Sequence, residues 1–133
     1  FLFEDDGELL AISRSGGKQA DLERAKPPYQ EWQRGVLPEY IGGPLLAMWG
    51  DHYLVGGRRS TGDGPVTTLY WLSDSDELVA FAALPSGGDN SYPGFVAFDE
   101  NRGLVSWYSS HEKDDQGNPI TAIYLAELHK KPQ

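Results

Sequence analysis

The sequence predicts an all-β chain folded as a β-propeller, with three four-stranded blade repeats that make half of a six-bladed ring. One strand pattern occurs three times, as ELLAISR at 8–14, HYLVGGR at 52–58 and RGLVSWY at 102–108. Sixteen Gly and nine Pro in 133 residues also indicate frequent turns and short strands. Four strands in about 45 residues, repeated, is the spacing of a propeller blade. The aligned positions are Leu10, Leu54 and Leu104, at intervals of 44 and 50 residues.

Each recurring stretch is expected to be the second strand of a hairpin. A short apolar run followed by turn residues comes before it in every repeat, and turn residues between two β-rich runs are typical of hairpins. The apolar runs and turns are FLF (1–3) with DDG (5–7), LLAMW (45–49) with GD (50–51), and FVAF (95–98) with DEN (99–101).

Third and fourth strands follow less regularly, and the predicted repeats cover about 1–40, 41–87 and 88–133. The third repeat ends after its third strand. Residues 22–25 (LERA) could instead be helical, with Pro27 and Pro28 ending any helix there. The expected third strands are TTLYWL (67–72) and TAIYLA (121–126), and the expected fourth strands are WQRGVL (32–37) and LVAFAAL (78–84).

Three blades do not close a ring, and open strand edges invite pairing with another chain. Two copies would supply six blades, so a homodimer that closes the propeller is the favoured assembly. The alternative is a fragment of a longer propeller, because the chain opens on Phe1 in what reads as the middle of a strand.

Composition excludes several kinds of partner. The net charge of −9 and pI near 4.6 oppose nucleic-acid binding, which needs a basic surface. No apolar run approaches the ~18 residues of a membrane helix, so no membrane partner is expected. The chain lacks Cys, its three His lack metal-ligand spacing, and it carries no phosphate-binding glycine loop. We therefore expect no metal and no cofactor.

Propeller topology predicts where a ligand would bind. In a blade, the loop between the second and third strands and the loop into the next blade lie on the same rim. Arg14, Arg58 and Tyr108 each follow the aligned leucine by four residues, an even offset that keeps them on one face of their strands. The three equivalent positions converge on one mouth, which makes this mouth the candidate ligand site.

Five stretches of the chain resemble the sialidase-like propellers with BNR repeats, also called Asp-box propellers. The Asp-box turn itself survives only as Trp32 and the acidic segment SDSD at 73–76. The stretches that carry the resemblance are KPPYQEW (26–32), IGGP (41–44), GGRR (56–59), LPSGGDNSYPG (84–94) and SWYSSHE (106–112).

The resemblance implies a glycoside hydrolase of the exo-sialidase type, or a sugar-binding protein, with its ligand at the central mouth. Such enzymes bind a carboxylate with arginines and use a Tyr nucleophile activated by a Glu. By resemblance, the carboxylate binders are Arg14, Arg58 and Arg59, the nucleophile pair is Tyr92 or Tyr108 with Glu112, and the acid is Asp89.

Tyr108, Ser109 and His111 complete the expected ligand-binding set. His111 beside Glu112 suits hydrogen bonding to sugar hydroxyls or proton transfer. Two alternatives stay open: a non-catalytic propeller that binds carbohydrate or protein, and a fragment with no independent activity. The resemblance alone suggests an extracellular or periplasmic location, and no signal peptide is expected within residues 1–133.

Overall fold

The computed structural model describes residues 1–131, which form β-strands and turns without any helix. No helix that could cross a membrane occurs among these residues. The strands are β1 (Leu2–Phe3), β2 (Leu9–Ser15), β3 (Lys18–Ala25), β4 (Trp32–Val36), β5 (Gly42–Trp49), β6 (His52–Thr61), β7 (Gly64–Leu72), β8 (Leu78–Ala83), β9 (Ser91–Ala97), β10 (Arg102–Lys113) and β11 (Pro119–His129).

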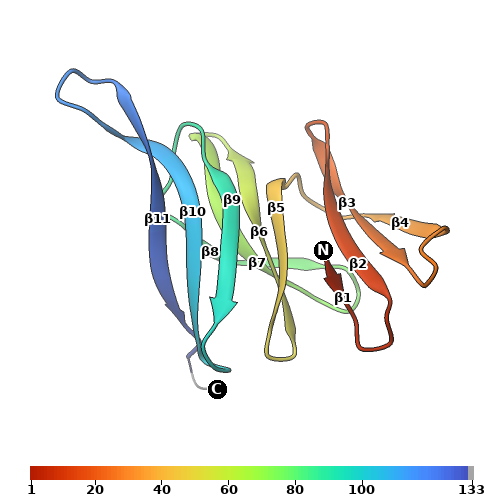
Figure 1. Ribbon diagram of the computed structural model, residues 1–133. Coiled ribbons are helices and arrows are strands. Elements are labelled where there is room, and N and C mark those ends of the chain that lie inside the picture. The colour runs from red at the N-terminus through yellow and green to blue at the C-terminus, as the bar shows by residue number, and fades with distance from the viewer. Residues whose placement is uncertain (132–133) are drawn as a thin grey trace.

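The strands form three antiparallel sheets in chain order, which confirms the all-β prediction. The first sheet has the order β1-β2-β3-β4, the second β5-β6-β7-β8, and the third β9-β10-β11. Figure 1 shows the three sheets side by side, and β5 lies against β2 on one side and β9 on the other. Residues 1–131 do not close into a ring.

The helical alternative for residues 22–25 is wrong, because these residues belong to β3. Leu22 pairs with Ile12 of β2 and is fully buried. Ala20 and Leu22 are buried while Asp21 and Glu23 are not, an alternation with the period of a strand. Packing of this apolar face overrides the weak helix preference of the segment.

Two apolar layers hold the three sheets together. The first layer joins sheets one and two and contains Leu10; the second joins sheets two and three and contains Leu54. Leu104, at the equivalent position of the third sheet, pairs with Val96 and Glu127, which are both exposed. The repeat therefore directs each of these leucines toward the next sheet, and residues 1–131 supply no sheet to cover Leu104.

Successive strands run in opposite directions, so two kinds of connection lie at the same end of the sheets. The turns at 16–17, 62–63 and 114–118 lie at this end together with the linkers 37–41 and 84–90. We call it the upper rim and the opposite end the lower rim. The upper rim holds all the sequence-predicted site residues.

Candidate functional site

Arg58 lies at the centre of a polar cluster on the upper rim. Its Nη1 donates a 3.2 Å hydrogen bond to the carbonyl oxygen of Asn90 and lies 3.4 Å from the carboxylate of Asp89. Its Nη2 donates to the hydroxyl of Tyr40 at 3.5 Å. Arg58 thus connects both inter-sheet linkers, and the charge-assisted bonds fix its guanidinium.

Asp89 receives two donors at a single oxygen. Tyr108 donates a 2.7 Å hydrogen bond to the same Oδ1 that faces Arg58. This hydrogen bond raises the pKa of Tyr108, so its phenol stays protonated near neutral pH. The Asp89 side chain is nevertheless 72% exposed, which leaves acceptor capacity for a ligand.

Tyr92 adds an exposed aromatic ring beside this cluster. The ring is 67% exposed and stacks on Tyr108, with 6.0 Å between ring centroids and 23° between planes. Tyr92 has φ +48, and the neighbouring Ser91 is fully buried with its hydroxyl bonded to the carbonyl of Gly42. Residues other than glycine seldom adopt a positive φ. Backbone strain of this kind is concentrated at functional sites.

A buried polar network holds the linker that carries Asp89. The side chain of Asn90 accepts a 2.7 Å hydrogen bond from Thr67 and donates to the carbonyls of Pro65 and Gly88. Asn90 is fully buried, so these bonds replace the water that it would otherwise hold. The linker therefore presents its polar groups from a rigid support.

Tyr40 belongs to the same cluster although its type and spacing gave no signal in the sequence. The hydrogen bond from Arg58 lowers the pKa of Tyr40, and the positive charges of Arg58 and Arg14 act in the same direction. This shift favours the phenolate. The only sequence signal was the position of Tyr40 in a linker on the predicted rim.

The structure does not form the nucleophile pair that the resemblance implied. Glu112 accepts a 2.7 Å hydrogen bond from Tyr124, and Tyr92 stacks on Tyr108. Tyr108 and Glu112 are four residues apart on β10, a rise of about 13 Å. The carboxylate that Tyr108 meets belongs to Asp89.

The remaining predicted residues lie on the same rim and contact other groups of the protein. Arg59 forms a 2.9 Å ion pair with Glu39. Ser109 is fully buried, and its hydroxyl accepts from the amide of Gly87 and lies 2.7 Å from Nδ1 of His111. Ser109 thus supports the 84–90 linker from β10, and Arg59 supports the 37–41 linker from β6. Ser109 is buried, so it contributes to a ligand site only by positioning the linker, whereas the Arg59 side chain is 43% exposed and keeps free donors beside its pair with Glu39.

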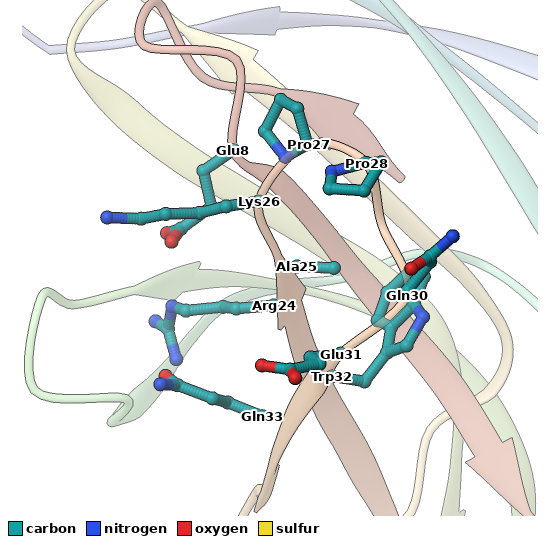
Figure 2. A pocket seen from close by; sticks show the side chains of 10 residues that line it. All are labelled: Glu8, Arg24, Ala25, Lys26, Pro27, Pro28, Gln30, Glu31, Trp32 and Gln33. Atoms are coloured by element: carbon teal, nitrogen blue, oxygen red, sulfur yellow. The ribbon is translucent and has the colours of Figure 1, made fainter.

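A polar hollow of about 550 Å³ lies elsewhere, at the lower end of the first sheet. Figure 2 shows Arg24, Lys26 and Gln33 extending to one side of the sheet while Trp32 extends to the other. Arg24 forms a 2.9 Å ion pair with Asp76 of the second sheet. None of the predicted site residues lines this hollow, so the Arg58 cluster is the better candidate site.

Residues 1–131 contain no group of three or more His, Asp or Glu side chains that could hold a metal ion. The Arg58 cluster itself offers hydrogen-bonding, charged and aromatic groups. These are the groups that proteins use to bind polar organic ligands.

No family model matches the chain. No curated protein matches it either. Among solved structures, the chain is similar to a protein of unknown function from Dyadobacter fermentans, with a TM-score of 0.73 and 19% sequence identity. The similarity covers 97% of this chain and 37% of that one, so the chain spans little more than a third of its structural neighbour. The comparison supports the arrangement of the sheets and assigns no activity.

Proposed function

We propose that the protein binds a carbohydrate at the Arg58 cluster on the upper rim. The observation that carries this proposal is the exposed Asp89 carboxylate, held between Arg58 and Tyr108 beside the open ring of Tyr92. A sugar offers hydroxyl pairs to a carboxylate and a guanidinium, and an apolar ring face to an aromatic side chain. The sialidase-like resemblance of the chain supports the same ligand class.

Support from the buried network makes the site suitable for binding without large rearrangement. Asp89 and Tyr92 flank Asn90 and Ser91, which are both fully buried and hydrogen-bonded. A preorganised site loses less conformational entropy on binding.

Calorimetric titration with a panel of neutral and acidic monosaccharides tests the proposal. Arg58→Ala should weaken binding by more than about 1 kcal/mol, or roughly fivefold. Arg102→Ala is the matched control, since Arg102 begins β10 at the lower rim and pairs with Asp99 and Glu127. Equal affinity in the native chain and Arg58→Ala would refute the site, as would equal losses in both variants.

A second candidate function is glycoside hydrolysis with Tyr40 as the nucleophile. The observation that favours it is the position of the Tyr40 hydroxyl 3.5 Å from Nη2 of Arg58, whose guanidinium also faces the Asp89 carboxylate and lowers the pKa of Tyr40. Release of 4-methylumbelliferone from a series of its glycosides measures this activity. Tyr40→Phe should abolish release while measurable sugar binding remains, because Arg58 keeps its contacts with Asp89 and Asn90. A Tyr40→Phe variant as active as the native chain would exclude this role.

We also propose that the sheets are propeller blades and that a second copy closes the ring. The first sheet leaves Phe3 exposed on its outer face, and the third sheet leaves Val96 and Leu125 exposed on its own. A head-to-tail contact between these faces would cover both. Light scattering on a size-exclusion column tests this: a dimer mass agrees with closure, and a folded monomer excludes it.

A further inference from the structure

The third sheet ends in an open strand, unlike the first two sheets. In those sheets the third strand pairs with a fourth, β3 with β4 and β7 with β8. Among residues 1–131, β11 pairs only with β10. Its outer edge therefore presents backbone N–H and C=O groups without strand partners, which is a template for strand addition.

An apolar groove of about 720 Å³ lies next to this open edge. Trp71, Val79 and Phe81 of the second sheet line it, together with Leu128 of β11. Trp71 and Phe81 stack with 4.5 Å between ring centroids, while Val79 remains 59% exposed. Trp71 also packs against the apolar layer that joins sheets two and three. The groove thus continues this layer into the place where a fourth strand of the third sheet would lie.

Positive charge is concentrated at the lower end of the groove. The ammonium group of Lys130 lies 4.6 Å from the ring centroid of Trp49 and 5.5 Å from that of Trp71. His129 and Lys131 line the same end. These basic side chains form a local patch of positive charge in a chain whose net charge is −9. A strand antiparallel to β11 would begin here, so a segment with acidic residues at its start fits best.

We propose that the edge of β11 and the Trp71–Phe81 groove bind an extended polypeptide segment as the fourth strand of the third sheet. The segment lies antiparallel to β11, places apolar side chains in the groove at alternate positions, and begins with acidic residues beside Lys130. It belongs to a partner polypeptide other than a second copy of this chain. The fourth strand of the second sheet has this chemistry, because Asp76 and Glu77 come directly before β8.

The probe is therefore a synthetic peptide with the sequence of residues 76–84 (DELVAFAAL), added to the folded chain. Amide exchange measured by NMR should slow at the β11 amides that do not bond to β10, because an added strand protects them. Val79→Asp should weaken peptide binding about tenfold or more by placing a charge in the groove. Val36→Asp is the matched control: Val36 is also an exposed valine on a fourth strand, but in the first sheet.

Three outcomes would overturn the proposal. The first is unchanged exchange of the β11 amides at saturating peptide. The second is equal loss of binding in Val79→Asp and Val36→Asp, both checked for native circular dichroism. The third is a peptide-free dimer that Val79→Asp converts to a monomer, which would assign the groove to a second copy. Sugar binding on the upper rim is expected to be unaffected by Val79→Asp, so failure of either proposal can be told from failure of the other.

Discussion

Tyr108 and Arg58 meet at one oxygen of Asp89, although they lie on strands of two different sheets. The phenol donates at 2.7 Å and the guanidinium lies at 3.4 Å. The carboxylate therefore determines the charge and the donor pattern of the rim site. Removing its charge while keeping its shape should change which ligands the site accepts.

Asp89→Asn should shift ligand preference from neutral toward acidic sugars. The substitution removes an acceptor for sugar hydroxyls and leaves the charge of Arg58 without its partner, so a ligand carboxylate could take that place. Calorimetric titration of paired neutral and acidic sugars measures the change. The pKa of Tyr108 should also fall toward its ordinary value of about 10, as measured by NMR titration of the ring signals. Unchanged preference together with an unchanged Tyr108 titration would contradict the assigned geometry.

Asn90→Ala should lower the free energy of unfolding by about 1–3 kcal/mol. The variant leaves the hydroxyl of Thr67 and the carbonyl of Pro65 buried without the partner that Asn90 provides. Urea denaturation measures the loss. Asn101→Ala, at an exposed turn position, is the control and should stay within about 0.5 kcal/mol. Equal effects of the two variants would mean that the buried network does not stabilise the linker.

Gly43→Ala should destabilise the chain more than Gly17→Ala does. Both glycines have positive φ, which costs an alanine about 1 kcal/mol. At Gly17 an added Cβ meets open space, whereas at Gly43 it would lie 2.7 Å from Oγ of Ser91 and 3.2 Å from the ring of Tyr92. Thermal unfolding separates the strain from the collision. Sugar affinity should fall in Gly43→Ala only, and a loss in both variants would argue against a role for Tyr92.

Stability should also depend on alkaline pH through Tyr53. Its hydrogen bond to Glu4 raises the pKa of Tyr53 to about 12, above the ordinary value of about 10. A raised folded pKa stabilises the fold fully below pH 10, and this contribution is lost as the pH rises toward 12. The difference in unfolding free energy between the native chain and Tyr53→Phe should therefore be constant up to pH 10 and decrease above it. A constant difference up to pH 12 would contradict the shift.

The sheet pattern could be predicted from the sequence because turn residues and alternating apolar residues are local signals. Leu10, Leu54 and Leu104 mark equivalent strands. The third strand could also be recognised in the sequences of repeats two and three. β3 was less clear, since its burial depends on packing against the second sheet and its composition does not exclude a helix.

The site was predicted less completely, because its contacts join loops that are distant in the sequence. The strand order predicted that Arg58 and Tyr108 lie on one rim, and the structure brings both to Asp89 there. The β10–β11 register places Glu112 opposite Ile120, and its hydrogen bond to Tyr124 spans a register shift between Ser109 and Glu112 that residue types alone do not reveal. Tyr40 was missed for the same reason, since only its contact with Arg58 distinguishes it from other tyrosines.

Alanine substitution of the equivalent leucines tests whether a neighbouring sheet covers each of them. The quantity compared is the loss in the free energy of unfolding. Leu54→Ala should cost about 2–5 kcal/mol, because Leu54 is fully buried in the layer between sheets two and three. Leu104→Ala should cost less than about 1.5 kcal/mol in the monomer, because its cross-strand neighbours Val96 and Glu127 are exposed. Urea denaturation at low protein concentration gives both values. If a second copy covers the third sheet, the cost of Leu104→Ala should rise with protein concentration. A cost that is small at every concentration would leave this face uncovered and would exclude ring closure by a second copy.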